Sequence, residues 1–303
     1  MSERFLVTGA CGFIGSHVLD SLIARGYDPV TIDLLTYAGE VERVRRTGLP
    51  FYQADIADTD LVADIAKRHR ITSIVNLAAE THVDNSIRDA KKFIHTNVDG
   101  VRSLLDVCRD LKIRLVHVST DEVYGPSGDV PFDEDARLNP QNPYAASKAA
   151  ADLLIQSYRN THGVRSLVVR PSNNFGPRQH TEKFIPTVIA SIMSGKMIPI
   201  YGDGRQKRQW TFVRDCARSI CDLAEGSSHD VVNVASSTVR ENIQVASSII
   251  EIVGKGSNLL QHVQDRPGHD REYWISSTRH AIASPTDFED ALRETVQNAM
   301  TRL

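Results

Sequence analysis

The sequence has few cysteines and little excess charge, and each shortage excludes a class of protein. Its 303 residues include four cysteines, which lack the paired spacing of a zinc site or of a disulfide framework. The formal net charge of -3 provides no basic surface for nucleic acid or for an anionic membrane. We therefore expect reduced thiols, a cytoplasmic location, and neither a metal site nor a nucleic-acid partner.

Long apolar runs and repeats are also absent. No window reaches the apolar length of a membrane span, and the N-terminus enters a strand pattern at Phe5–Val7 without a secretory signal. We find no internal repeat, low-complexity tract or long run of like charge. What is present, 41% hydrophobic and 24% charged residues, suits a globular chain that buries a full core in one large or two smaller domains.

The N-terminal segment has the pattern of a dinucleotide-binding unit. The strand pattern Phe5–Val7 leads into three glycines within Gly9–Gly15, and an amphipathic helix pattern follows. Such glycines let the main chain turn tightly and approach a pyrophosphate, which the amides of the helix N-terminus stabilise. Asp33 ends the next strand pattern about 20 residues later, where a carboxylate binds an adenine ribose and repels a 2′-phosphate. Although the spacing is G-x-x-G-x-x-G rather than the commoner G-x-G-x-x-G, the combination predicts NAD rather than NADP.

Strand and helix patterns alternate through the rest of the first half. Apolar runs at Phe51–Asp55, Ile74–Ala79 and Leu115–Val118 are separated by helical patterns. Alternation of this kind predicts a parallel, doubly wound, Rossmann-type α/β sheet. Ligands of such sheets lie beyond the carboxyl ends of the strands, which is where Asp55 and Thr120 fall.

The alternation becomes irregular after Leu167–Arg170, where the polar, turn-rich segment Pro171–Pro177 begins. We expect an NAD-binding domain over residues 1–170 and a smaller α/β substrate-binding domain over residues 171–303, with room for some later elements to pack back on the first domain. The clear patterns of the second half are helices Phe184–Met193, Val213–Glu225 and Asn242–Val253, and strands Ile198–Tyr201 and Val231–Val234.

Tyr144 and Lys148 stand one helical turn apart and could form an acid-base pair. In a helix that begins near Pro143, both side chains share a face. A nearby ammonium favours phenolate over phenol, and the nicotinamide ring adds a second positive charge. Tyr144 can then serve as a base while Thr120 bonds the same substrate oxygen. For the pair alone, a surface helix with an incidental tyrosine and lysine is the commoner explanation. The dinucleotide pattern and Thr120 favour the catalytic interpretation.

Two adjacent carboxylic acids, Asp121 and Glu122, follow the strand pattern Leu115–Val118. Neighbouring residues in an extended strand point to opposite faces, so both reach one ligand only if the chain turns before Gly125. For the pair alone, a solvated acidic turn is the commoner explanation. The neighbouring Thr120 makes the pair a candidate for proton transfer.

Motifs of a known superfamily recur along the chain. They are Gly9–Gly15, Leu35–Gly39, Ala78–Asp84, Thr120–Gly125, Tyr144–Lys148, Ser172–Pro177, Glu182–Pro186, Tyr201–Gly204 and Arg266–Asp270. The glycine segment, Thr120–Gly125 and Tyr144–Lys148 resemble the extended short-chain dehydrogenase/reductases. Taken together, the motifs resemble the dTDP-glucose 4,6-dehydratases of that superfamily over nearly the whole chain.

The resemblance implies a redox-neutral dehydration of a nucleotide-diphosphate glucose, with dTDP-glucose as the expected substrate. Tyr144, assisted by Thr120 and Lys148, takes the proton of the C4 hydroxyl as a hydride passes to NAD. Glu122 then removes the C5 proton, Asp121 protonates the C6 hydroxyl that leaves as water, and the hydride returns to C6. Nucleotide-sugar 4-epimerases carry small or apolar residues in place of this acid pair, and GDP-mannose dehydratases pair serine with glutamate. The acid pair therefore favours dehydration of a glucose-type sugar.

The resemblance also implies two sets of binding residues. The expected NAD-binding residues are Gly9, Gly12, Phe13, Ile14, Gly15, Asp33, Leu35, Thr36, Asp55, Ile56, Leu77, Ala78, Ala79, Thr81, Tyr144 and Lys148. The expected substrate-binding residues are His82, Asn173, Asn174, Lys183, Phe184, Ile185, Pro199, Tyr201, Arg208, Asn242, His269 and Tyr273.

Two departures from the family pattern concern the substrate. The segment Ser276–Pro285 is shorter than its usual counterpart, which leaves the packing around the nucleotide open. Arg178 stands where an aromatic residue is frequent, and an added cation there indicates an altered preference for the base or the sugar.

Two other functions stay open at this point. One is dehydration of another nucleotide sugar, such as a UDP-sugar, and the other is a non-catalytic NAD-binding regulator with the same fold. The intact catalytic set argues against the regulator, because a sensor does not need it. The family also implies a homodimer, formed through Ala90–Leu111 and Tyr144–His162.

Overall fold

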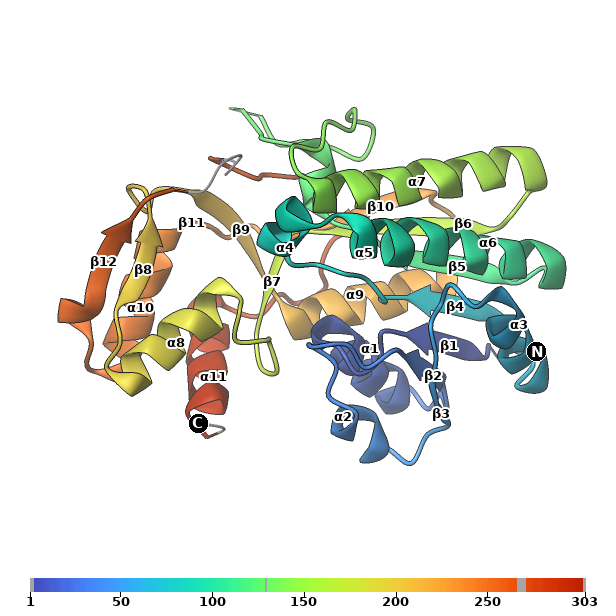
Figure 1. Ribbon diagram of the computed structural model, residues 1–303, viewed down its shortest axis with the longest axis horizontal. Helices are drawn as coiled ribbons and strands as arrows, with labels where there is room; N and C mark the ends of the chain where they lie inside the picture. The colour runs from blue at the N-terminus through green and yellow to red at the C-terminus, as the bar shows by residue number, and fades with distance from the viewer. Residues whose placement is uncertain (1–2, 129, 266–270, 302–303) are drawn as a thin grey trace.

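A parallel sheet of seven strands forms the centre of the described part of the molecule (Figure 1). The computed structural model describes residues 3–128, 130–265 and 271–301. The strand order is β10-β6-β5-β4-β1-β2-β3, and the order reverses between β1 and β4, where ligands of such sheets bind. The strands are β1 (Phe5–Thr8), β2 (Val30–Asp33), β3 (Phe51–Gln53), β4 (Ser73–Asn76), β5 (Arg114–Val118), β6 (Ser166–Pro171) and β10 (Val231–Val234).

Helices cover both faces of this sheet. α1 (Phe13–Ala24) and α9 (Val213–Gly226) pack on one face, whereas α3 (Thr59–Arg68), α6 (Gly100–Leu111) and α7 (Pro143–His162) pack on the other (Figure 1). The central strands are therefore almost fully buried, as their apolar runs require. The predicted Rossmann-type α/β fold is confirmed. Within the described ranges, no helix combines the length and apolar character needed to cross a bilayer.

Shorter helical elements lie in the connections of this half. They are α2 (Glu42–Arg45), α4 (Val83–Arg88), α5 (Lys91–Phe93), the π-helix η1 (Ile94–Asp99) and the 3-10 helix η2 (Asp121–Tyr124). η1 continues into α6 and packs against α7.

A smaller lobe, on the left in Figure 1, has a core of its own. Its elements are β7 (Asn173–Phe175), α8 (Phe184–Ser194), β8 (Ile198–Tyr201), β9 (Lys207–Phe212), β11 (Val239–Glu241), α10 (Asn242–Val253), η3 (Ser257–Leu259), β12 (Leu260–Val263) and α11 (Phe288–Met300). β9 lies between β11 and β7, and β8 pairs with β12. Phe175 lies at the centre of this core, with its ring 6.2 Å from that of Trp210 and 5.3 Å from that of Phe288.

Two elements that follow residue 170 return to the first sheet. β10 pairs in parallel with β6, with Val231 opposite Val168, and α9 packs along α1. Their buried apolar side chains complete the layers of the Rossmann half. The chain therefore crosses between the lobes more than once, and crossing segments such as 171–174 contribute to the functional cleft.

Candidate active site

A cleft of about 490 Å³ lies between the two lobes, beyond the carboxyl ends of the main-sheet strands. Most of the residues predicted from the sequence line it. They are Gly9, Gly12, Phe13, Ile14, Gly15, Leu77, Ala79, Thr81, His82, Thr120, Asp121, Glu122, Tyr144, Lys148, Asn173, Asn174, Lys183, Phe184, Pro199, Tyr201, Arg208 and Asn242. Residues from both halves of the sequence therefore converge on one site.

The glycine segment brings main chain close to the cleft. Gly9 has a φ of +67°, and a Cβ there would lie 2.6 Å from the nitrogen of Ala78. A Cβ at Gly15 would lie 2.1 Å from the carbonyl oxygen of Gly9, so neither position accepts a side chain. α1 begins at Phe13, and no side chain caps it at Gly12. This uncapped helix N-terminus suits the phosphates of NAD.

Asp33 lies at the carboxyl end of β2 and is buried. Its Oδ2 accepts the N–H of Cys11 at 2.9 Å, and its Oδ1 accepts that of Leu35 at 2.8 Å. Burial raises the pKa of Asp33, while these two hydrogen bonds oppose the rise. The carboxylate thus fixes the glycine segment and the next loop, and each oxygen keeps a lone pair that can accept a ribose hydroxyl.

The chain turns directly after β5, as the adjacent acids require. Thr120 caps η2 at its N-terminus, and its hydroxyl accepts the N–H of Glu122 at 3.3 Å. Gly125 ends η2 with a φ of +80°, where a Cβ would lie 2.3 Å from the carbonyl oxygen of Asn139. Because Asp121 and Glu122 belong to this tight helix rather than to an extended strand, both line the cleft, as predicted.

Asp121 keeps its proton up to about neutral pH. The residue is 2% exposed. Its Oδ1 accepts the hydroxyl of Thr120 at 3.2 Å, and its Oδ2 has no hydrogen-bond partner among the described residues. Burial, followed by the charge of Glu122, raises the pKa of Asp121 to about 7. A buried carboxyl of this kind can protonate a leaving hydroxyl as a general acid.

Asn142 connects Glu122 to the start of α7. Its Oδ1 accepts the N–H of Ala145 at 2.8 Å, which caps the helix one residue before Pro143. Its Nδ2 donates to Oε2 of Glu122 at 3.3 Å. One side chain therefore positions the Glu122 carboxylate against the helix that carries Tyr144.

Tyr144 is buried in the same corner of the cleft. Burial and then the carboxylate of Glu122 raise the pKa of the phenol, while a hydrogen bond with Thr120 opposes the rise. The charge of Asp121 raises the pKa further. The predicted shift toward phenolate counted the nicotinamide ring as well as Lys148. In the protein alone, burial and the carboxyls of Glu122, Asp121 and Asp152 shift the pKa of Tyr144 in the opposite direction.

Lys148 is 2% exposed beside the cleft. Its Nζ donates to the carbonyl oxygen of Val118 at 2.7 Å and lies 3.2 Å from Nε2 of His117. Burial lowers the pKa of Lys148 to about 8, and the carboxylate of Asp152 opposes this change. The ammonium is thus held by β5 as well as by its own helix.

The substrate half of the cleft contains polar atoms that no described residue satisfies. Oδ1 of Asn173, Oδ1 of Asn242 and Nε1 of Trp210 are buried without a hydrogen-bond partner in residues 3–128, 130–265 and 271–301. The guanidinium of Arg208 lies 4.6 Å from the ring centre of Tyr273. Tyr273 therefore packs against Arg208 rather than lining the cleft. A cation beside these amides suits a nucleotide diphosphate.

Some predicted residues do not line the cleft. They are Asp33, Leu35, Thr36, Asp55, Ile56, Ala78, Ile185 and Tyr273. The side chain of Ile185 lies in the core of the smaller lobe, and Ile56 packs beneath the Gly100 main chain. Oδ2 of Asp55 lies 2.9 Å from Nε2 of His95. His269 falls outside the described residues.

Other residues line the cleft without having been predicted. They are Ala38, Val83, Asp84, Val118, Ser119, Pro171, Ser172, Gln179, His180, Glu182, Thr187 and Trp210. Ser119 and Ser172 directly follow strands β5 and β6, so the strand-end rule could have identified them. Glu182 accepts the hydroxyl of Tyr37 at 3.1 Å and lies 3.6 Å from Nε2 of His82. These contacts join distant segments, and no local pattern predicts them.

Arg178 does not face the substrate half of the cleft. Its guanidinium pairs with Asp20 at 2.8 Å and donates to the carbonyl oxygen of Ser16 at 3.3 Å. Both partners belong to α1. Arg178 therefore joins the segment after β7 to the Rossmann half, and its effect on the preference for the base or the sugar stays a prediction.

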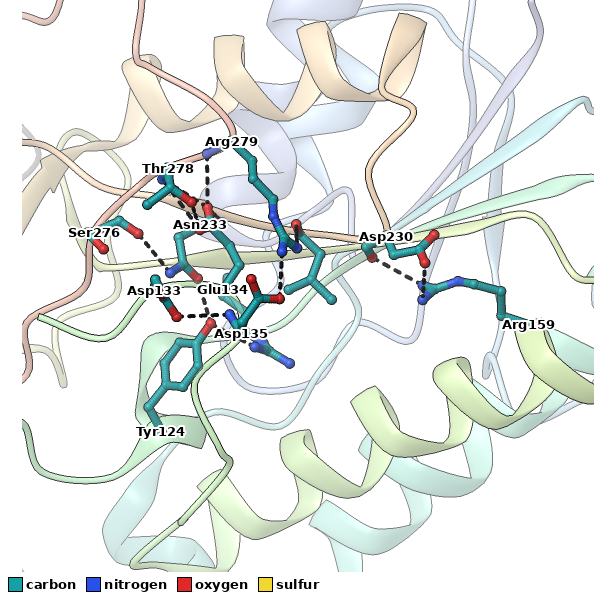
Figure 2. Close-up of polar contacts among 12 residues, drawn as sticks. Tyr124, Asp133, Glu134, Asp135, Arg159, Asp230, Asn233, Ser276, Thr278 and Arg279 are labelled. Atoms are coloured by element: carbon teal, nitrogen blue, oxygen red, sulfur yellow. Dashed lines mark hydrogen bonds and ion pairs between the residues drawn. The ribbon is translucent and has the colours of Figure 1, made fainter.

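The C-terminal segment packs beside η2 (Figure 2). Glu134 accepts the N–H of Thr278 at 3.2 Å and that of Asn233 at 3.1 Å. Oδ1 of Asn233 accepts the hydroxyl of Tyr124 at 2.9 Å, and its Nδ2 donates to the carbonyl oxygen of Ser276 at 2.9 Å. None of the described residues from 271 onward lines the cleft. The shortened segment therefore supports η2 rather than surrounding the nucleotide.

Similarity to known proteins extends over almost the whole chain. The model of the NAD dependent epimerase/dehydratase family matches residues 5–235. A low-salt glycan biosynthesis protein of Haloferax volcanii is 43% identical over 96% of each chain, and a dTDP-glucose 4,6-dehydratase of Streptomyces niveus is 38% identical over 97% of this chain and 92% of its own. A dTDP-glucose 4,6-dehydratase of Streptomyces venezuelae, solved with NAD bound, has a TM-score of 0.94 and 35% identity over 98% of this chain and 97% of that one. The chain belongs to the NAD dependent epimerase/dehydratase family.

Proposed function

We propose that the protein is an NAD-dependent hydro-lyase that converts dTDP-glucose to its 4-keto-6-deoxy product. The family includes epimerases as well as dehydratases, so the choice between them depends on the site. The observation that carries the choice is Asp121, a buried carboxyl whose pKa is raised to about 7 beside Glu122 in the cleft. An epimerase has no leaving hydroxyl to protonate and needs no such acid.

NAD fits the Rossmann half of the cleft. The uncapped N-terminus of α1 faces the expected pyrophosphate, and close main-chain packing at Gly9 and Gly15 leaves no side chain in its way. Asp33 keeps acceptor capacity for ribose hydroxyls, which favours NAD over NADP. When bound, NAD accepts a hydride from C4 of the sugar and later returns it to C6.

Tyr144 and Thr120 act on the C4 hydroxyl. Tyr144 takes its proton, and Thr120 hydrogen-bonds the same oxygen and holds it in line. Because burial and the carboxyls raise the pKa of Tyr144, the phenol needs positive charge nearby before it can serve as a base. Lys148, one helical turn further along α7, supplies a cation that lines the same cleft.

Glu122 and Asp121 act on the two neighbouring carbons. Once C4 is a ketone, the C5 proton is acidic, and Glu122, held by Asn142, removes it. The C6–O bond breaks as Asp121 transfers its proton to the leaving hydroxyl, which departs as water, and a C5–C6 double bond forms. The elimination therefore needs one ionised and one protonated carboxyl, and the raised pKa of Asp121 favours this division.

The smaller lobe binds the nucleotide diphosphate. Arg208 supplies a guanidinium that is oriented by the ring of Tyr273. The unsatisfied oxygens of Asn173 and Asn242 can accept donors from the base or the ribose. The most specific part of this proposal is that the site recognises thymine rather than another pyrimidine base.

We also expect a homodimer that works in the cytoplasm. Ile87, Ile94 and Leu153 are large apolar side chains that are 48%, 47% and 55% exposed. They lie on α4, η1 and α7, and both α4 and η1 pack against α7. An apolar face of this kind suits burial against a second copy. The four cysteines are free and buried, which suits a reducing compartment.

A panel of nucleotide sugars tests the proposal. The protein is incubated with dTDP-glucose, UDP-glucose, GDP-glucose and N-acetylated analogues, and 4-keto-6-deoxy products are detected by NMR. We expect the highest kcat/KM for dTDP-glucose. A higher kcat/KM for a UDP-sugar would identify that sugar as the substrate instead. Turnover of none of the sugars would favour the NAD-binding regulator.

A further inference from the structure

A row of polar side chains crosses the main sheet toward Lys148. Thr8, Asn76 and His117 occupy one level of β1, β4 and β5, since Thr8 is the register partner of Asn76 and Asn76 that of His117. All three residues are 0% exposed. Side chains at matched positions of neighbouring parallel strands point to the same face of the sheet, so the three form a continuous polar row.

Hydrogen bonds connect the row and end on the lysine. The hydroxyl of Thr8 lies 2.5 Å from Oδ1 of Asn76, and Nδ2 of Asn76 lies 2.9 Å from Nδ1 of His117. Nε2 of His117 then lies 3.2 Å from Nζ of Lys148. Burial of so many polar groups between apolar layers destabilises a fold unless each group is bonded. This row is hydrogen-bonded throughout and ends on Lys148, which lines the cleft. Its position therefore indicates a role at the functional site in addition to a role in stability.

The row permits two arrangements of protons. A neutral imidazole has one N–H and one acceptor nitrogen. When Lys148 is an ammonium, Nε2 of His117 accepts its hydrogen bond, so Nδ1 carries the proton and Asn76 must present its oxygen. When Lys148 is a neutral amine, Nε2 carries the proton and donates to Nζ. Nδ1 then accepts from the amide nitrogen of Asn76, in the orientation that the Thr8 hydroxyl favours.

We propose that His117 is a positioning residue for Lys148, and that its tautomer follows the charge of the lysine. In the net change the pair releases one proton: Nζ becomes neutral, the imidazole proton moves from Nδ1 to Nε2, and the amide of Asn76 turns. No other bond changes and no electron is transferred. The inference rests on the proposed function only through the role of Lys148. It identifies His117 as the group that stabilises the charged form of Lys148.

The surroundings assign the titration to the lysine. Asp152 on α7 and His117 on β5 act on Lys148 directly, and Arg170 on β6 pairs with Asp152. Tyr144 on α7 and Asp121 and Glu122 on η2 line the same cleft. Asp152 and Arg170 hold one another at 2.9 Å. Burial lowers the pKa of Lys148 to about 8, and burial, together with the lysine charge, lowers that of His117 well below its usual value. The imidazole therefore stays neutral while the ammonium titrates.

Nitrogen-15 NMR of the histidine rings tests this without substrate. The signals of His117 are identified by their loss in His117→Gln among the 11 histidines. We expect the Nδ1–H tautomer well below pH 8, the Nε2–H tautomer well above it, and no switch in Lys148→Met. One tautomer throughout the range, or an imidazolium at neutral pH, would overturn the inference.

Two variants of His117 separate positioning from packing. His117→Gln can keep an acceptor near the Nε2 position, whereas His117→Asn keeps a group near Nδ1 and withdraws from Lys148. In His117→Asn, the alkaline limb of single-turnover NAD reduction, a step that does not use the Asp121 acid, should move down by about one pH unit, the value of a lost hydrogen bond to a charge. In His117→Gln it should stay in place. Identical limbs in all three proteins would contradict the inference. If no sugar is turned over, the proposed function fails, and the NMR result still decides the role of His117.

Discussion

The two halves of the cleft are assembled in different ways. On the Rossmann half, the groups expected to perform chemistry come from the ends of strands and from one helix, and they lie within short stretches of sequence such as 120–122 and 144–148. On the smaller lobe, Asn173, Arg208 and Asn242 come from β7, β9 and α10 and meet only in the folded chain. The comparison teaches that local sequence encodes the reaction, whereas long-range packing encodes recognition of the nucleotide.

The largest effect is expected on the Rossmann half. Tyr144→Phe removes the base, so reduction of NAD by substrate should fall by about 10³-fold, within the usual range for general-base catalysis. The measurement is single-turnover absorbance of the reduced nicotinamide. Tyr158→Phe is the control and should stay near the wild-type rate. Tyr158 lies on the same helix as Tyr144 but outside the cleft, and its hydroxyl donates to Asp106. A comparable rate in Tyr144→Phe would remove the residue from the base role.

Asp121→Asn should separate the two chemical stages. Oxidation at C4 should persist, whereas loss of water should slow by about 10²-fold because the amide cannot protonate the leaving hydroxyl. In the wild type the elimination rate should fall as pH rises through about 7, where Asp121 loses its proton. The variant should lack that limb. Rapid-quench analysis of product checks both results, and full dehydration by the variant would place the acid elsewhere.

The same substitution should change stability with pH. Because the pKa of Asp121 is raised from 3.8 to about 7 in the folded protein, the unfolded chain ionises first. The wild type therefore loses stability as pH rises from about 4 to about 7. Asp121→Asn should be more stable than the wild type above neutral pH, by roughly a few kcal/mol, and the gap should close near pH 4. Denaturant unfolding at both pH values measures it, and a gap independent of pH would contradict the assignment.

A smaller effect is expected on the recognition half. Arg208→Lys loses the planar guanidinium that stacks on Tyr273, so KM should rise about tenfold while kcat changes less. Arg240→Lys, an exposed arginine outside the cleft, serves as the control. A fall in kcat with KM unchanged would show that the two halves do not divide the work in this way.

The fold and the catalytic corner could be predicted because their signals are local. The glycine spacing, Asp33 at a strand end, and Tyr144 four residues before Lys148 each lie within one supersecondary unit. A turn after β5 was required by the adjacent acids, and η2 supplies it.

The remaining features depend on contacts between distant segments. Arg178 turns to Asp20 on α1, and Tyr273 packs on Arg208 away from the cleft. The pKa shift of Tyr144 in the protein alone depends on how deeply the phenol is buried and on how close the carboxyls come. The polar row through His117 depends on strand register, which spacing along the chain does not reveal.

Intramolecular hydride return is the central claim, and isotope transfer tests it most directly. The protein is incubated with dTDP-glucose that carries deuterium at C4, and the product is examined by NMR and mass spectrometry. We predict a 4-keto-6-deoxy sugar that carries the deuterium at C6, with one solvent-derived hydrogen at C5. Loss of the deuterium to solvent, or its return to C4 with inverted configuration, would contradict the dehydratase assignment.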